Sequence, residues 1–206
     1  REDPRDAWVS PVASSIPALP DGATIGTASL RRQAQVLAAR PDLKVVPLRG
    51  NVGTRLQKLA RGEAAGTLLA LAGLKRLGRM DAVTAILSTE EMLPAVAQGA
   101  IGVEIRSDDG KTRRLLEPLN HPPTSIAVAA ERACLAELEG SCRTPIAAYA
   151  ELDGDRLRLR GLIALPDGSA LHRAEERGIA TLEGAAALGL AVGRRLKALA
   201  GPGFLA

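Results

Sequence analysis

Residues 23–76 alternate three short apolar segments with two segments of helical periodicity. The apolar segments, residues 23–26, 44–48 and 67–72, predict three strands, and the segments between them predict two helices. This order favours a parallel sheet covered by helices, because each helix must carry the chain back to the same end of the sheet. The third segment is apolar throughout, which is typical of a strand covered on both faces. We therefore expect an α/β fold with a parallel sheet in this region.

Both predicted helices have recognisable ends. Ser29 is a suitable N-cap for the first helix, and Pro41 cannot continue that helix. The second helix is expected over 51–61 and ends at Gly62, which readily takes a left-handed conformation. Each helix thus begins just after the carboxyl end of a strand.

The C-terminal third of the chain has a different pattern. A predicted helix over 124–139 is followed by alternating segments separated by Asp-Gly turns, which are a strong hairpin signal. These segments cover residues 146–152, 156–164 and 169–177, and a last helix covers about 182–200. The pattern predicts an α+β domain with a three-stranded antiparallel sheet, in which Arg156, Arg158 and Arg160 form a solvent-exposed face.

A less regular stretch lies between these regions. Residues 93–99 are expected to form a linker or hinge, residues 100–105 a strand, and residues from about 108 to 119 a polar helix. Residues 120–123 are expected to be a boundary, because their two prolines do not continue a helix.

Arginine dominates the positive charge of the chain, with 22 Arg and 5 Lys against 23 acidic residues, for a net charge of +4. Codon usage in a GC-rich genome would explain part of this excess. A ligand with carboxylates or phosphates would explain it differently, since guanidinium groups bind planar anions through paired hydrogen bonds. The positions of the arginines must distinguish the two explanations.

Cations follow each of the three predicted strands of the first half. The carboxyl ends of parallel strands meet at one edge of a sheet, where ligands bind and helix N-termini favour anions. The residues concerned are Thr27, Ser29, Arg31 and Arg32 after the first strand, Arg49 and Arg55 after the second, and Lys75 and Arg76 after the third. The alternative is that these are ordinary solvated loop cations, which contribute little to stability. The pattern predicts a polyanion site and does not separate carboxylates from phosphates.

Several classes of function are disfavoured. Residues 50–54 lack the Gly-Lys-Ser/Thr ending of a nucleotide-binding P-loop. Only Trp8, Tyr149 and Phe204 are aromatic, so single-stranded nucleic acid would find few stacking surfaces, and only the sequence pI of about 9.5 favours such a partner. The sequence shows no membrane-spanning apolar run, secretory signal or metal-ligand spacing. We therefore expect a cytoplasmic protein without a metal, a nucleic-acid partner or membrane association.

The two cysteines are expected to have different roles. Cys142 lies between Gly140 and Pro145, on a tight loop, and the adjacent Arg143 would favour its thiolate. Cys134 falls in the middle of the predicted helix among Ala and Leu, and is expected to be a small core residue.

Five segments, in the same order along the chain, resemble the porphobilinogen deaminase (hydroxymethylbilane synthase) family. They are residues 26–33 (GTASLRRQ), 48–56 (LRGNVGTRL), 72–78 (AGLKRLG), 93–100 (LPAVAQGA) and 138–142 (LEGSC). The resemblance implies a transferase of heme (tetrapyrrole) biosynthesis with three domains, the first two folded like periplasmic binding proteins. It also implies a dipyrromethane cofactor joined to Cys142 by a thioether. On that cofactor, four porphobilinogen units are linked with loss of ammonia and released as hydroxymethylbilane.

The resemblance also implies roles for particular residues. Contacts to carboxylates of the cofactor or substrate are implied for Arg31, Arg32, Arg49, Arg55 and Arg76, assisted by Thr27 and Ser29. Gln98 matches a hinge position. The family's catalytic aspartate corresponds to neither Asp3 nor Asp6, and is expected to lie in an N-terminal segment that precedes this sequence.

On this basis residues 1–93 are expected to be the second domain, residues 94–121 a hinge with a returning part of the first domain, and residues 122–206 the cofactor-bearing third domain. We expect porphobilinogen as the substrate and a monomer at full length, and we expect the 206-residue chain to be inactive by itself. The alternative is a non-catalytic module that binds polycarboxylates. Ala97 stands where the family more usually has Gly.

Overall fold

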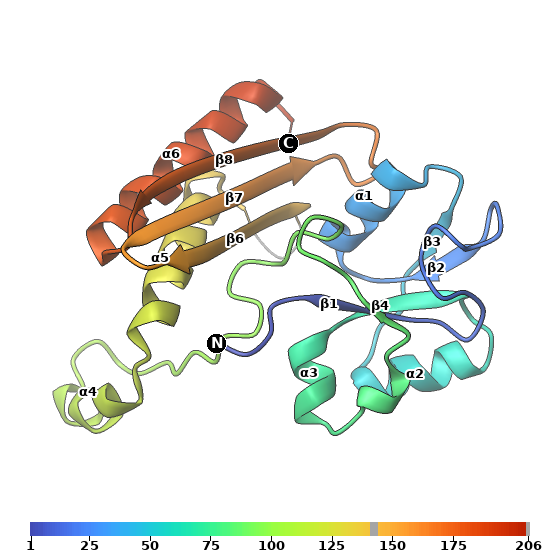
Figure 1. Ribbon diagram of the computed structural model, residues 1–206, viewed down its shortest axis with the longest axis horizontal. Helices are drawn as coiled ribbons and strands as arrows, with labels where there is room; N and C mark the ends of the chain where they lie inside the picture. Colours follow the sequence, from blue (N-terminus) through green and yellow to red (C-terminus); the bar gives the residue numbers. More distant parts are fainter. Residues whose placement is uncertain (141–143, 205–206) are drawn as a thin grey trace.

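The computed structural model describes residues 1–140 and 144–204, which form a five-stranded sheet (sheet A) and a three-stranded sheet (sheet B) (Figure 1). The strands are β1 (Asp6–Val9), β2 (Thr24–Gly26), β3 (Lys44–Val46), β4 (Gly66–Ala70), β5 (Ala85–Ile86), β6 (Ile146–Asp153), β7 (Arg156–Ala164) and β8 (Leu171–Ile179). The helices are α1 (Leu30–Ala39), α2 (Val52–Ala60), α3 (Leu71–Arg76), α4 (Gly110–Leu116), α5 (Pro122–Glu137) and α6 (Leu182–Ala200), with 3-10 turns η1 (Met80–Ala82) and η2 (Glu117–Leu119). Within these ranges, every helix is too short or too polar to span a membrane.

Sheet A has the strand order β3-β2-β4-β1-β5. β2 runs parallel to β3 and to β4, which confirms the predicted parallel arrangement of these three strands. β1 is absent from the prediction, and it makes the sheet mixed because it runs antiparallel to β4 and β5. Its four residues are all buried, so they lack the alternation that would have indicated a strand. The register pairs Asp6 with Ala70, which places the first residue of β1 beside the carboxyl end of β4.

The helices that follow the parallel strands begin as predicted. Ser29 caps α1 and Asn51 caps α2, and each accepts a hydrogen bond from the backbone N–H three residues later. The third strand is shorter than predicted, because β4 ends at Ala70 and α3 follows without a loop. Lys75 and Arg76 therefore lie on the last turn of a helix, which corrects their predicted place in a loop.

Sheet B has the predicted antiparallel order β6-β7-β8. Helices α5 and α6 pack against it around a core of aliphatic side chains that includes Leu157, Leu159 and Val192. Pro122 and Pro123 form the first turn of α5 instead of preceding it, because the first N–H groups of a helix have no intrahelical partner to lose.

The arginines of β7 differ in exposure, which corrects the prediction of one solvent-exposed face. The side chain of Arg156 is 70% exposed, whereas that of Arg160 is 11% exposed. Arg160 forms ion pairs at 2.8 Å with Glu90 and with Glu151. Its guanidinium group therefore joins sheet B to the loop that precedes the 93–99 linker.

Residues 100–105 form no strand, contrary to the prediction. A strand needs a neighbouring backbone, and no strand of the described residues pairs with this segment. Its Ile101 and Val103 side chains are largely exposed. The predicted helix after it is present as α4 and η2, with Asp109 as the N-cap of α4. In Figure 1, α4 projects away from both sheets.

The two sheets meet at α1, which lies against the β7–β8 end of sheet B (Figure 1). A small buried core at this contact comprises Ala34, Leu93, Ala147, Leu162 and Ala164. The turn between β7 and β8 adds a hydrogen bond of 3.0 Å from Gln33 Nε2 to the Pro166 carbonyl oxygen. Gly168 in this turn lies so close to α1 that a Cβ there would be 2.4 Å from the Ala38 nitrogen. Helix α1 is thus fixed against both sheets.

Candidate functional site

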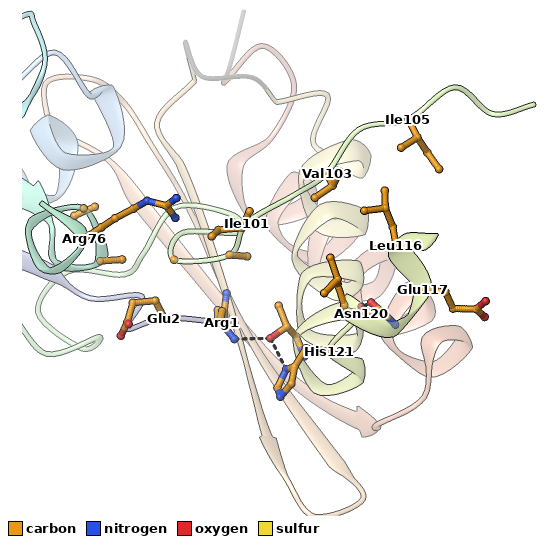
Figure 2. A pocket seen from close by; sticks show the side chains of 18 of the residues that line it. Arg1, Glu2, Arg76, Ile101, Val103, Ile105, Leu116, Glu117, Asn120 and His121 are labelled. Carbon is orange, nitrogen blue, oxygen red and sulfur yellow. Dashed lines mark hydrogen bonds between the residues drawn. The ribbon is translucent and has the colours of Figure 1, made fainter. Parts of the chain in front are cut away.

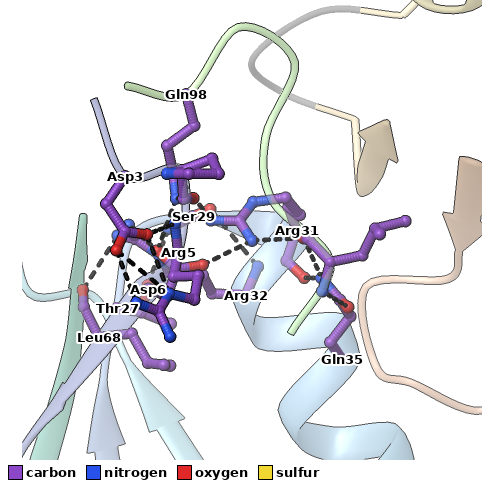
Figure 3. Close-up of polar contacts among 12 residues, drawn as sticks. Asp3, Arg5, Asp6, Thr27, Ser29, Arg31, Arg32, Gln35, Leu68 and Gln98 are labelled. Carbon is purple, nitrogen blue, oxygen red and sulfur yellow. Dashed lines mark hydrogen bonds and ion pairs between the residues drawn. The ribbon is translucent and has the colours of Figure 1, made fainter. Parts of the chain in front are cut away.

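Figure 3 shows Thr27, Ser29, Arg31, Arg32 and Gln98 grouped around Asp6 at the carboxyl edge of the parallel strands. The chain order explains this grouping. β2 ends just before Thr27, Ser29 caps α1, and the first turn of α1 carries both arginines. Because β1 is antiparallel to β4, its first residue, Asp6, reaches the same edge.

Asp6 is fully buried and pairs with two guanidinium groups. Arg32 donates to Asp6 Oδ1 from Nη2 at 2.7 Å and from Nε at 3.2 Å. Arg31 Nη1 lies 2.8 Å from Asp6 Oδ2. Each guanidinium also donates to a backbone carbonyl, Arg32 to that of Leu68 at 3.0 Å and Arg31 to that of Leu93 at 2.7 Å. One carboxylate therefore orients both arginines.

Arg31 and Arg32 are 5% and 7% exposed, so the alternative that they are solvated loop cations is wrong for these two residues. The first turn of α1 directs them toward Asp6, a partner that the sequence prediction did not include. Breaking a buried ion pair leaves an uncompensated buried charge. These two arginines therefore contribute to stability, unlike surface cations. Their contact with a ligand stays a prediction.

The electrostatics of this cluster leave it positively charged. Burial raises the pKa of the Asp6 carboxyl, but the charges of Arg32 and Arg31 outweigh burial and hold that pKa below its ordinary value. Burial lowers the pKa of the Arg31 guanidinium, which starts so high that the group stays protonated at neutral pH. Two positive charges therefore face one negative charge.

The predicted hinge is tied to the same cluster. Gln98 Nε2 donates to the Pro4 carbonyl at 2.6 Å and to Asp6 Oδ1 at 3.1 Å. At the other end of the linker, Gln35 Oε1 accepts from the Leu93 N–H at 2.8 Å, and Gln35 Nε2 donates to the Leu93 carbonyl at 3.1 Å. The linker is thus held to β1 and α1 at both of its ends.

Thr27 and Ser29 shape the loop between β2 and α1. Thr27 is 4% exposed, and its Oγ1 accepts a hydrogen bond of 3.1 Å from the Ser29 N–H. The Ser29 hydroxyl in turn accepts from the Arg32 N–H. Both side chains therefore set the position at which α1 begins.

Arg49 and Arg55 lie outside this buried cluster. Arg49 is exposed in the loop between β3 and α2, and forms no hydrogen bond or ion pair with the described residues. Arg55 is half-buried, and its Nε donates to the Gly50 carbonyl at 2.8 Å. Burial and the nearby charge of Arg32 lower the pKa of the Arg55 guanidinium. Arg49 is thus available to bind an anion from solvent.

Arg76 lines a separate cleft of about 1080 Å³. Figure 2 shows Arg76 on one side of this cleft and the α4–η2 region on the other. The extended segment 99–105 contributes to its wall, as do the cations Arg113 and Arg114 and the imidazole of His121. The neighbouring Lys75 also lines it, whereas the other residues predicted to bind a polyanion do not. The structure therefore does not bring Arg76 into the Asp6 cluster.

The cysteine predictions have different outcomes. Cys142 lies outside the described residues. Cys134 is a free, fully buried thiol in α5, which confirms that it is a core residue. Burial raises the pKa of its thiol to about 12, and the charges of Glu131 and Glu137 act in the same direction.

The sequence prediction missed two buried carboxylates, Asp6 and Glu131. Glu131 accepts hydrogen bonds from the Ala97 N–H at 2.7 Å and the Ala150 N–H at 2.9 Å, and it pairs with Arg1 at 2.7 Å. Burial raises the pKa of its carboxyl in spite of these donors. The available signal was an acidic residue beside apolar neighbours, which indicates burial only once the surrounding fold is known.

Two family models match the chain. Residues 1–114 match the model described as "Porphobilinogen deaminase, dipyromethane cofactor binding domain", and residues 125–198 match "Porphobilinogen deaminase, C-terminal domain". The porphobilinogen deaminase of Nitrobacter winogradskyi is 53% identical over 204 residues, and the chloroplastic porphobilinogen deaminase of Oryza sativa subsp. japonica is 53% identical over 205 residues. Both alignments cover 99% of this chain, but 64% and 57% of the two relatives. The chain thus spans less than two thirds of the length of these curated relatives.

Proposed function

The chain belongs to the porphobilinogen deaminase family, and we propose that its protein is the transferase that links four porphobilinogen units, with loss of ammonia, into hydroxymethylbilane. The family model that matches residues 1–114 is that of a domain that binds dipyrromethane. When bound, this cofactor supplies the covalent anchor on which the pyrrole chain grows. The residues of this chain bind and orient carboxylates around it.

The observation that carries this proposal is the surplus of positive charge on the arginines that follow β2, β3 and β4 along the chain. Arg31 and Arg32 share one carboxylate, and Arg49 and Arg76 have no acidic partner among the described residues. Porphobilinogen and dipyrromethane carry acetate and propionate arms, so a growing chain gathers many carboxylates. Guanidinium groups bind carboxylates through paired hydrogen bonds and keep their charge at neutral pH. The residues present therefore fit the cofactor and the substrate.

The buried and exposed arginines have different roles in this proposal. Arg49, Arg55 and Arg76 bind ligand carboxylates directly, since each keeps guanidinium N–H groups without a partner among the described residues. Arg31 and Arg32 supply positive potential from a fixed position, because Asp6 and backbone carbonyls already orient them. Thr27 and Ser29 assist by shaping the loop that leads into α1, and Gln98 holds the hinge.

Cys142 is the proposed point of cofactor attachment. The thiolate is the nucleophilic form of cysteine, and burial keeps the Cys134 thiol neutral at physiological pH. Cys142→Ser in the full-length protein should therefore remove the cofactor mass from the intact protein, whereas Cys134→Ser should retain it. Active protein in which peptide mapping finds Cys142 unmodified would overturn this assignment.

Residues 1–206 are proposed to be insufficient for catalysis by themselves. General acid–base catalysis needs a proton carrier within hydrogen-bond reach of the reacting atoms. Asp6 is unsuited to this task, because two guanidinium groups hold it ionised at neutral pH. Adding the N-terminal segment of a relative, in cis or as a separate chain, should restore some activity. Hydroxymethylbilane formation by residues 1–206 alone would contradict the proposal.

The direct test measures ammonia release and hydroxymethylbilane formation from porphobilinogen by the full-length protein. Arg49→Ala should reduce turnover strongly, and Arg49→Lys should rescue it poorly because lysine lacks the planar fork. Arg156→Ala is the matched control, since Arg156 is an exposed cation of sheet B. A protein that binds polycarboxylates but releases no ammonia would be the non-catalytic module instead.

The domain boundaries after residues 93 and 121, the cytoplasmic location and the monomeric state at full length belong to the same proposal. Limited proteolysis tests the boundaries, cell fractionation tests the location, and light scattering tests the oligomeric state.

A further inference from the structure

Asp6 is a fully buried carboxylate at the amino end of β1, next to the buried apolar residues Ala7, Trp8 and Val9. Burying an ionised carboxylate is unfavourable unless the charge is paired and hydrogen-bonded. An apolar residue would fill an interior strand position without that cost. The presence of Asp6 here therefore points to a role in holding the groups that surround it.

Three side chains from two other parts of the molecule converge on this carboxylate (Figure 3). Asp6 Oδ1 accepts from Arg32 Nη2 at 2.7 Å and from Gln98 Nε2 at 3.1 Å. Asp6 Oδ2 pairs with Arg31 Nη1 at 2.8 Å. Helix α1 supplies both arginines and the 93–99 linker supplies the glutamine. Asp6 is thus the common acceptor of a helix and of the hinge.

The charges of this cluster explain why a common acceptor is needed. Two guanidinium groups that are buried close together repel each other, and the low dielectric of the interior strengthens that repulsion. Asp6 is the only carboxylate that pairs with Arg31 or Arg32 within residues 1–140 and 144–204. Without it, we expect the two arginines to separate and to lose their bonds to the Leu68 and Leu93 carbonyls.

We infer that Asp6 is a positioning residue, which fixes Arg31, Arg32 and the hinge residue Gln98 as one unit at the ligand-binding edge of sheet A. Asp6 acts through the arginines and does not itself contact the ligand. The expected effect on turnover rests on the proposed function. The positioning itself is a property of the fold, and is measurable without substrate.

The first experiment replaces Asp6 with alanine in the full-length protein and returns a carboxylate as sodium formate, which is small enough to enter the vacated space. Asp6→Ala should melt at a lower temperature than the wild type, and formate should raise its melting temperature more than sodium chloride at the same concentration. Asp3→Ala is the matched control, since Asp3 lies on the same segment and pairs with Arg5 nearer the surface. Formate should act on this control no differently from chloride.

The outcomes of that experiment are decisive. An Asp6→Ala protein that folds only in formate supports the inference as strongly as a rise in melting temperature. A variant as stable as the wild type would overturn it. So would equal effects of formate and chloride, or an unfolded variant that formate does not rescue.

The second experiment measures the hinge and the reaction. Asp6→Asn should increase hydrogen exchange in residues 93–98, and should lower porphobilinogen turnover by about tenfold to 100-fold, as a small displacement of positioned charges does. Formate should restore part of the turnover of Asp6→Ala. Normal exchange and turnover in Asp6→Asn would contradict the positioning role. If the wild type itself does not consume porphobilinogen, the proposed function fails, while the effect of formate on melting still decides the role of Asp6.

Discussion

At the scale of single residues, burial divides the arginines that follow β2, β3 and β4 into two groups. Arg49 and Arg76 are exposed and lack partners among the described residues, whereas Arg31 and Arg32 are buried against Asp6. An exposed cation can leave solvent for a ligand at little cost to the fold. A buried cation that already has acceptors is part of the fold itself. Replacing a buried arginine with alanine should therefore change the stability of the fold more than the same replacement of an exposed arginine.

Arg31→Ala should lower the free energy of unfolding by about 2 kcal/mol or more, because it breaks a buried ion pair. Arg49→Ala should change that free energy by less than about 0.5 kcal/mol, as is usual for an exposed side chain. Urea unfolding of both variants compares them directly. Equal stability of the two variants would show that the Asp6 cluster does not hold the fold together.

The buried thiol of Cys134 should make the protein less stable at alkaline pH. The pKa of this thiol is about 12 in the folded protein, against an ordinary value of 9.0. Above pH 9 the unfolded chain therefore loses the proton while the folded chain keeps it, so stability falls as the pH rises. Cys134→Ser should cost about 1 kcal/mol at neutral pH. The difference in the free energy of unfolding between this variant and the wild type should become smaller in alkaline buffer, as measured by unfolding at several pH values. A difference that does not change with pH would contradict the raised pKa of the Cys134 thiol.

At the scale of secondary-structure elements, local chemistry predicted the elements that local signals define. Local signals such as the capping residue Ser29 and the Asp-Gly turns of sheet B predicted β2 to β4, α1, α2 and the C-terminal hairpins with nearly the bounds that the structure shows. β1 and residues 100–105 were predicted wrongly, since strand formation there depends on a partner distant in sequence. The same reason hid the burial of Arg31 and Arg32, whose partner Asp6 lies on β1. The loops that carry the site residues were therefore predictable, but the pairing of Arg31 and Arg32 with Asp6 was not.

The 93–99 linker contains a strained residue at its centre. Ala97 has a φ of +60°, a left-handed conformation that disfavours residues with a Cβ. Its N–H donates to the buried Glu131 carboxylate at 2.7 Å, which fixes the backbone in that conformation. The linker is therefore held by the Glu131 side chain of α5 as well as by Asp6.

Ala97→Gly should raise the free energy of unfolding by about 0.5–1 kcal/mol, because the relief of left-handed strain exceeds the entropy cost of glycine. Chemical denaturation measures the gain. Ala95→Gly in the same linker serves as the control and should be destabilising, since Ala95 is not among the residues with positive φ. A loss of stability in Ala97→Gly as well would show that the strain at Ala97 is negligible.

At the scale of the whole molecule, the relative position of the two sheets depends on their contact at α1. The buried core of this contact is small and aliphatic. A hydrogen bond or ion pair reinforces this core at each end. Gln33 donates to the Pro166 carbonyl at one end, and Arg160 pairs with Glu90 at the other. Since α1 carries Arg31 and Arg32, this contact also sets where the arginine cluster lies relative to sheet B.

Gly168, in the β7–β8 turn at this contact, has no space for a side chain. It has a φ of +73°, and a Cβ there would lie 2.4 Å from the Ala38 nitrogen, in the backbone of α1. Gly154, in the other hairpin turn of sheet B, has a φ of +57° and nothing within 4 Å of such a Cβ.

Gly154→Ala should therefore show the cost of left-handed strain alone, about 1 kcal/mol. Gly168→Ala should cost about 1–3 kcal/mol more, because the added methyl group has no space against a backbone. Hydrogen exchange should also increase in α1 and in the β7–β8 turn of Gly168→Ala, but not in the core between α5 and sheet B. Equal stability and equal exchange in the two variants would mean that the contact at α1 rearranges without loss of stability and does not fix the relative position of the two sheets.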